Sequence, residues 1–252
     1  MLEAEINRRR QQQDILLMTH IVLGYPSLAA SRDIAHAMVD AGGDMMELQI
    51  PFSEPIADGP VILHANQRAL AAGITVEACL ELGARLAREL PIPLVFMSYY
   101  NIVFMRGIER FARETRAAGL HGAIVPDVPF EEGQQLMAAF ERERLAPIFC
   151  YAPTTSDARM RAIAEHARGF IYCVARRGVT GTATEFGSLD AYLARCRSAT
   201  KLPLALGFGV KSRSDVEAVT GKVDIAVVGS ETIRVVEEQG VGAVGTFIRS
   251  LR

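Results

Sequence analysis

Two acidic residues near the end of one apolar segment could carry chemistry. Glu47 lies in the apolar run DMMELQI, and Asp58 follows it by eleven residues, after PFSEPIA. Two carboxylates in surroundings of different polarity can take different roles. A buried one can give and take a proton, whereas one that stays ionised stabilises positive charge. Glu47 and Asp58 are therefore candidates for acid–base chemistry.

Two glycine motifs further along the chain predict a phosphate site. Gly207, Phe208 and Gly209 end one apolar run, and Gly229 and Ser230 end the next, where a helix is expected to begin. Backbone N–H groups at a helix N-terminus attract an anion, and glycines let the backbone approach it closely. Either motif alone fits a tight turn. Together they favour a phosphate site, because the loops after strands seven and eight hold phosphate in many α/β barrels.

These residues must be positioned by a chain in which apolar runs alternate with amphipathic segments. We expect strands at residues 19–24, 44–50, 93–100, 121–127, 146–152, 169–175, 203–209 and 223–230. Nearly continuous apolar strands indicate a parallel sheet covered on both faces. Eight such units in 252 residues favour a (β/α)8 TIM barrel over an open doubly wound sheet. We expect one α/β domain over residues 1–252, with an extra helix at 3–13 closing the amino-terminal end of the barrel.

The active site of a TIM barrel lies at the carboxyl ends of its strands and in the loops that follow them. The polar residues at those ends are therefore candidates: Glu47, Gln49, Asp58, Tyr99–Asn101, Asp127, Tyr172, the loop 176–187 and the two glycine motifs. This loop is long for such a connection, which favours a lid over the site. Asp127, in Pro-Asp-Val-Pro, is expected to shape its loop rather than react.

Composition argues against several kinds of partner. The formal net charge is −2, so neither nucleic acid nor a membrane surface is expected to bind. No apolar run reaches the ~18 residues of a membrane span, and the start of the chain lacks the apolar core of a signal peptide. The four cysteines have no CxxC spacing, which is typical of reduced, mostly buried thiols in a cytoplasmic protein. The five histidines show no metal-ligand spacing, so no metal site is expected.

Six motifs, in order, resemble one known family. They are PFSEPIADGPVI, MSYYNIVF, VPDVPFEE, RRGVTG, GFGVKS and VVGSETI, and the likeness extends from about His20 to the last helix. Together they closely resemble the tryptophan synthase alpha subunit. The resemblance implies a TIM-barrel lyase of tryptophan biosynthesis, which cleaves indole-3-glycerol phosphate to indole and glyceraldehyde 3-phosphate without a metal or organic cofactor. It also implies a beta subunit as partner, in a heterotetramer in which the beta subunit carries pyridoxal phosphate.

The resemblance further implies a role for each residue that matches a motif. Glu47 matches the general acid/base, and Asp58 matches the second catalytic carboxylate. The expected substrate-binding residues are Gly181, Gly209, Gly229 and Ser230 at the phosphate, Tyr172 and Thr180 beside the acids, Phe208 against the indole, and Tyr99, His20 and Gln49 at neighbouring strand ends.

Three residues depart from the usual family pattern without removing a catalytic residue. Gln49 stands where the family usually has glycine, and it is expected to point toward the barrel mouth, as Glu47 does. It could crowd the substrate or form a hydrogen bond with Glu47. Glu54 replaces an aspartate in the loop that faces the beta subunit, and His20 replaces an apolar aromatic residue beside the indole.

Alternatives remain at this stage. Asp58 precedes Gly59 and fits a turn residue, and Glu47 could be a buried acid with a structural hydrogen bond. The chain could also be a stand-alone lyase that releases free indole, or a weakly active regulatory partner of a beta subunit. Indole release with and without that subunit separates these functions.

Overall fold

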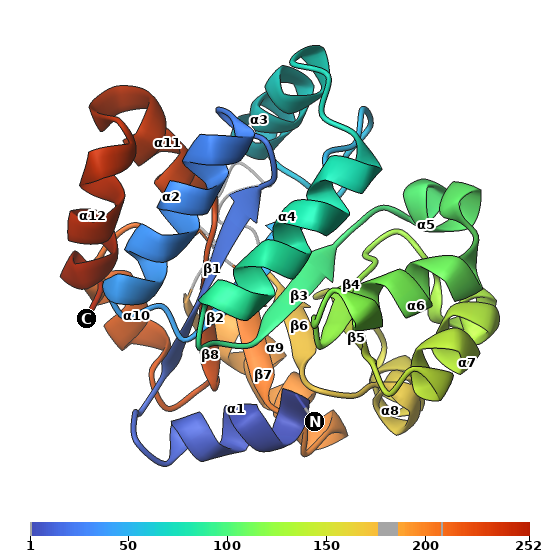
Figure 1. The fold of residues 1–252 in the computed structure, drawn as a ribbon. Helices are drawn as coiled ribbons and strands as arrows, with labels where there is room; N and C mark the ends of the chain where they lie inside the picture. Colours follow the sequence, from blue (N-terminus) through green and yellow to red (C-terminus); the bar gives the residue numbers. More distant parts are fainter. Residues whose placement is uncertain (1, 176–185, 208) are drawn as a thin grey trace.

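Eight parallel strands close into a barrel (Figure 1). The computed structural model describes residues 2–175, 186–207 and 209–252. The strands pair in chain order, and β1 pairs with β8 to close the sheet. Their bounds are β1 (Leu16–Val22), β2 (Met45–Gln49), β3 (Leu94–Met97), β4 (Gly122–Ile124), β5 (Ala146–Tyr151), β6 (Ile171–Val174), β7 (Leu204–Gly207) and β8 (Ile225–Val228). The predicted TIM barrel is confirmed, and every expected strand overlaps an observed one.

Helices surround the barrel and cover the outer face of the sheet (Figure 1). They are α1 (Leu2–Arg10), α2 (Leu28–Asp40), α3 (Pro60–Ala71), α4 (Val76–Glu89), α5 (Tyr100–Arg106), α6 (Ile108–Ala117), η1 (Phe130–Glu132), α7 (Gln134–Arg142), α8 (Asp157–His166), α9 (Phe186–Ala199), α10 (Arg213–Val219), α11 (Ser230–Gln239), η2 (Val241–Ala243) and α12 (Val244–Ser250). Ser27, Thr75 and Ser156 cap α2, α4 and α8, because each side chain accepts a hydrogen bond from a backbone N–H of the first turn. Within the described residues, no helix is long and apolar enough to cross a membrane.

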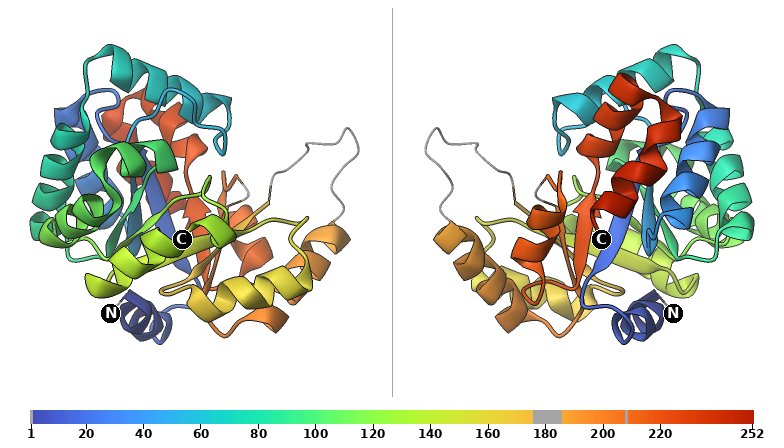
Figure 2. Two further views of the ribbon diagram at one scale, coloured as in Figure 1. Left: turned by 90° about the vertical axis from the view of Figure 1, so that its right-hand side faces the viewer. Right: turned by 90° about the vertical axis from the view of Figure 1, so that its left-hand side faces the viewer.

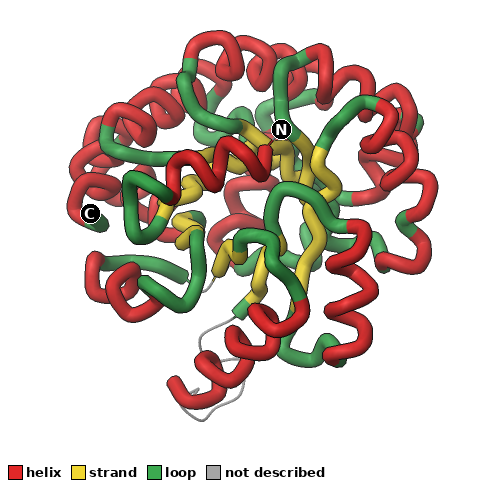
Figure 3. Tube along the Cα trace, turned by 90° about the horizontal axis from the view of Figure 1, so that it is seen from below, coloured by secondary structure: helices red, strands yellow, loops and turns green. Residues whose placement is uncertain are grey.

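Packed side chains fill the barrel interior. Helix α1 lies across its amino-terminal end (Figures 2 and 3). Leu2 and Ile6 of α1 belong to the same buried cluster as Met18, Met45 and Phe170 inside the barrel. The expected N-terminal helix is therefore confirmed. This end of the barrel is filled by apolar side chains. The polar side chains that point into the barrel therefore lie at its opposite, carboxyl-terminal end.

The strand alternation decides which side chains reach that opposite end. On β2, Met46 and Leu48 pack outward against the helices, whereas Met45 packs inward. Glu47 consequently points into the barrel two residues beyond Met45. On β1 the inward residue Met18 is followed by His20, which pairs in register with Glu47.

Two helices that the sequence pattern did not predict, α3 and α5, lie in the connections after β2 and β3. Pro60 occupies the first turn of α3, where its missing N–H leaves no hydrogen bond unmade. Asp127 accepts hydrogen bonds from the backbone N–H of Tyr100, the first residue of α5, at 2.8 and 3.1 Å. The expected loop-shaping role of Asp127 is thus confirmed.

Candidate active site

A cavity of about 520 Å³ opens at the carboxyl ends of the strands. A volume of this size suits a small organic substrate. Seven of the residues expected from the sequence line it: His20, Glu47, Asp58, Tyr172, Gly209, Gly229 and Ser230. They come from β1, β2, β6 and the connections after β2, β7 and β8, so the fold gathers residues far apart in the sequence.

Glu47 is buried against the cavity wall with one oxygen held and one free. Its side chain is 5% exposed, and Oε1 lies 3.3 Å from Nδ1 of His20. Within the described part of the chain, Oε2 has no hydrogen-bond partner. A buried carboxylate oxygen without a partner is costly unless a ligand or water satisfies it. Oε2 is therefore the oxygen of Glu47 whose hydrogen-bonding capacity is left for a bound molecule or water to satisfy.

Asp58 is held in place by two donors on a single oxygen. Gln49 donates from Nε2 to Oδ2 at 2.7 Å, and the hydroxyl of Tyr99 donates to the same oxygen at 2.9 Å. The backbone N–H of Ala57 in turn donates to the Tyr99 hydroxyl at 3.1 Å, which ties the loop to the residue that precedes α5. Burial raises the pKa of Asp58, although the two donors and a charged His20 act in the opposite direction.

Gln49 and Tyr99 consequently lie behind the cavity wall rather than on it. Both are fully buried, and neither side chain is among the residues that line the cavity. Gln49 points toward the barrel mouth as expected, but its amide donates to Asp58 and not to Glu47. Alternation along β2 predicts the direction of this side chain, whereas its partner depends on how the following loop folds back.

One end of the cavity is largely apolar. Met97, Ile124, Pro126, Cys150 and Tyr172 line this end, and burial raises the pKa of the Cys150 thiol to about 12, so the thiol stays neutral. Gly207 allows the close packing, because a side chain at this position would meet the Tyr172 hydroxyl at 2.8 Å. This end is suited to a flat aromatic ring.

The other end has the features of an anion site. Gly229 precedes the first residue of α11, Ser230, and both line the cavity. Gly209, whose φ of +84° favours glycine, lies on the same wall. Lys211 and Arg234 add positive charge there, and the sequence analysis did not single them out. Their positions in the sequence could have identified them, since Lys211 lies two residues after Gly209 and Arg234 lies one helical turn after Ser230.

Three expected site residues, Thr180, Gly181 and Phe208, lie outside the described residues, as does most of the loop 176–187. Within the part of the chain that is described, no group of three or more His, Cys, Asp or Glu residues could hold a metal ion. Of the four cysteines, three are buried.

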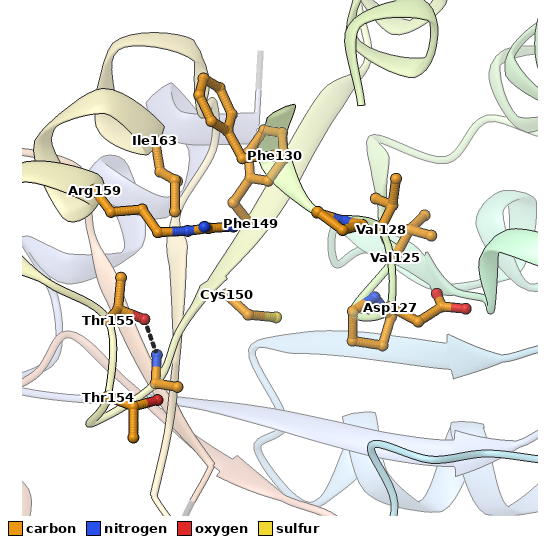
Figure 4. A pocket seen from close by; sticks show the side chains of 13 residues that line it. Val125, Asp127, Val128, Phe130, Phe149, Cys150, Thr154, Thr155, Arg159 and Ile163 are labelled. Atoms are coloured by element: carbon orange, nitrogen blue, oxygen red, sulfur yellow. Dashed lines mark hydrogen bonds between the residues drawn. The ribbon is translucent and has the colours of Figure 1, made fainter. Parts of the chain in front are cut away.

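A second cavity, of about 430 Å³, adjoins the first (Figure 4). It lies between the segment after β4 and the start of α8, and the two cavities share Pro126 and Cys150. Its wall combines Phe130, Phe149 and Arg159, and the Arg159 guanidinium pairs with Glu131 at the rim. Asp127 lines this second cavity and not the first, which fits its role in the loop.

The fold and the site define a TIM-barrel protein whose cavity holds two carboxylates, an apolar end and a glycine-rich end with two basic residues. The family model for the tryptophan synthase alpha chain matches residues 6–247. The tryptophan synthase alpha chains of Syntrophotalea carbinolica and Desulforapulum autotrophicum are 59% and 56% identical to this chain, each over the whole of both chains. This chain belongs to the tryptophan synthase alpha chain family, and it is a lyase.

Solved structures agree with this assignment. A structure of tryptophan synthase from Mycobacterium tuberculosis has a TM-score of 0.92 at 32% identity, covering 99% of this chain and 96% of that chain. The alpha subunit from Legionella pneumophila has a TM-score of 0.90 at 29% identity, with coverage of 99% and 96%. The family predicted from the six sequence motifs is thereby confirmed.

Proposed function

We propose that this chain cleaves indole-3-glycerol phosphate to indole and glyceraldehyde 3-phosphate in the cytoplasm, with Glu47 and Asp58 as the catalytic residues. One observation carries the proposal: the two carboxylates line one cavity between an apolar end and a glycine-rich, cationic end. An indole ring suits the first end and a phosphate the second. The reaction needs no metal or organic cofactor.

The chemistry explains why two carboxylates are needed. To break the bond between indole C3 and the glycerol chain, C3 must gain a proton and the glycerol hydroxyl must lose one. Glu47 can supply the first proton from Oε2 and take the second on the same oxygen, so it ends as it began. Asp58, as a carboxylate, stabilises the positive charge that develops on the ring nitrogen. The two donors on Oδ2 fix its position before the substrate arrives.

Ser230→Asp is expected to raise KM for the substrate by about 10- to 100-fold, because a new carboxylate would repel the phosphate at close range. kcat is expected to change less, since the acids are untouched. Steady-state kinetics of indole release measure both constants. Ser27→Asp is the control for a new carboxylate at the start of a helix: Ser27 caps α2, it lies outside the cavity, and aspartate caps equally well. An unchanged KM in the Ser230 variant would place the phosphate elsewhere.

For this alpha chain we further propose a beta subunit as partner, which docks on the rim beside the cavity. Ile56, Phe104 and Met105 are 76%, 60% and 76% exposed, respectively. Ile56 lies in the loop after β2, and the other two lie on α5 after β3. The hydrogen bond from Ala57 to Tyr99 holds this loop against the start of α5. Exposed apolar residues gathered at one rim favour a protein interface.

Replacing both Phe104 and Met105 by serine is expected to weaken binding of the beta subunit about tenfold or more. Indole release by the chain alone should stay unchanged, because neither side chain lines the cavity. Titrating the beta subunit while following indole release measures the affinity. Arg8→Ala, on α1 at the closed end of the barrel, serves as the control. Equal affinities for the double variant and the control would contradict this docking site.

A stand-alone lyase is the second candidate, and one observation favours it. Asp58 is already held by side chains of this chain itself, Gln49 and Tyr99. The deciding experiment measures indole release from the purified chain, with and without the beta subunit. Rapid release by the chain alone indicates a stand-alone lyase, whereas release that depends on the partner indicates an alpha subunit. No release in either case would refute the proposed function.

A further inference from the structure

His20 is placed to act on the reaction through Glu47. The two residues pair in register on β1 and β2, and their side chains are 4% and 5% exposed. Nδ1 of His20 lies 3.3 Å from Oε1 of Glu47. Among the described residues, Nε2 of His20 and Oε2 of Glu47 have no hydrogen-bond partner. The contact therefore leaves one buried polar atom on each side chain without a partner, next to the amide of Gln49.

We infer that His20 and Glu47 form a pair that shares one proton, in which His20 holds Oε1 and leaves Oε2 to exchange protons with the substrate. His20 is then a positioning residue, not a catalytic one. The inference rests on the proposed function for the identity of the reaction. The pairing itself rests on the geometry of two buried side chains.

Over one turnover, the His20–Glu47 pair gives up one proton and takes up one. Before reaction, the pair holds one titratable proton, either on Oε2 of Glu47 or on the imidazole. Oε2 gives this proton to indole C3, which leaves a carboxylate beside a neutral imidazole that still donates from Nδ1. The carboxylate then takes the proton of the glycerol hydroxyl as the carbon–carbon bond breaks and the aldehyde forms. The pair returns to its starting state without another reactant.

The surroundings of His20 favour such sharing. The titratable groups that line the same cavity are Glu47 of β2, Asp58 of the next loop, Cys150 of β5, Tyr172 of β6, Lys211 after β7 and Arg234 of α11. The lining residues of β8 and α3, which flank β1, carry none. Burial alone would lower the pKa of His20, but the carboxylates of Glu47 and Asp58, together with the amide of Gln49, outweigh burial, and the pKa is raised.

The first test does not depend on catalysis. NMR titration of the His20 imidazole should show that its pKa falls in Glu47→Gln, which removes the charge and keeps the shape. Asp58→Asn should lower it less, because Glu47 acts on His20 more strongly than Asp58 does. The exposed His64 provides an internal reference. An unchanged His20 titration in Glu47→Gln would overturn the inference, even if the proposed reaction stands.

The second test uses the pH dependence of kcat/KM for indole release. Activity is expected to fall as pH rises through the point at which the pair loses its proton. His20→Phe should lower kcat by about 10- to 100-fold, since Glu47 is no longer held in position. It should also shift the fall in activity at high pH, the alkaline limb of the profile, to lower pH. His20→Asn keeps a hydrogen-bond donor for Oε1 of Glu47 but cannot titrate. Its kcat should therefore lie between those of His20→Phe and the wild type, and its alkaline limb should stay at the lower pH of His20→Phe.

Controls separate this inference from the proposed function. His64→Phe, at an exposed position of α3 outside the cavity, should leave the rate and the profile unchanged. If the wild-type chain releases no indole, the proposed function fails, while the NMR titration still tests the pair. If His20→Phe keeps the wild-type rate and limb, or His20→Asn restores the wild-type limb, the shared proton is refuted.

Discussion

Glu47→Gln is expected to reduce kcat for indole release by about 10³-fold while the protein stays folded. The amide cannot deliver a proton to C3 or accept one from the glycerol hydroxyl, and general acid–base catalysis typically contributes about 10²- to 10⁴-fold. The loss should appear in kcat more than in KM, because the proton moves only in the transition state. Steady-state assays at saturating substrate measure kcat directly.

Glutamine is a close match for the geometry of this site. Its carbonyl oxygen can still lie beside Nδ1 of His20, 3.3 Å from Oε1 in the wild-type chain. The packing around β2 should therefore survive, and thermal unfolding together with binding of an unreactive indole-alkyl phosphate checks this. The exposed Glu54, on the loop after β2, provides the matched control as Glu54→Gln. A Glu47 variant that turns over at the wild-type rate would remove Glu47 from the mechanism.

The barrel could be predicted from sequence because its strands carry a strong local signal. Apolar runs bounded by helical segments identified all eight strands, and the helix expected at residues 3–13 corresponds to α1. The start of β1 was wrong: the strand begins at Leu16, three residues before the expected one. The expected strand left out the apolar residues before Thr19 and began at two polar residues, Thr19 and His20, both of which are buried. Burial of these two depends on neighbours across the sheet.

The sequence predicted those residues of the candidate site that lie at strand ends, but not the contacts that depend on the loops between them. Glu47 and the glycine motifs follow from alternation and position, so their places on the cavity wall were accessible from sequence. The partner of Gln49 was not, because it depends on a loop that returns nine residues later to bring Asp58 alongside. The same limit applies to α3 and α5, since tertiary contacts such as the Asp127 cap decide where these helices begin.

Asp58→Asn is the second substitution expected to have a large effect, with kcat reduced by about 10²- to 10³-fold. Removing one preorganised electrostatic partner of a developing charge typically has an effect of this size. Asparagine keeps the shape, and its carbonyl oxygen can take the place of Oδ2, which accepts from both Gln49 and Tyr99. The loop should therefore remain in place while the negative charge is lost.

The stability of this variant should not fall together with its activity. Burial raises the pKa of Asp58 in the folded chain, so the folded state disfavours the ionised form. The stability that this carboxyl contributes is present below its unfolded pKa and is lost as pH rises through the folded pKa. At neutral pH an uncharged side chain should thus be tolerated at least as well. Thermal unfolding at pH 7 should show no loss for Asp58→Asn.

The pH dependence of the wild-type chain tests the same carboxylate independently. Because Asp58 must be ionised to act, kcat should fall as pH decreases through its raised pKa, earlier than for an ordinary aspartate. This acid limb should disappear from the residual activity of Asp58→Asn and persist in Asp14→Asn, an exposed acid on the amino-terminal side of β1. If the limb persists in Asp58→Asn, another group produces it. If the rate also survives, charge stabilisation in this reaction must come from elsewhere in the cavity.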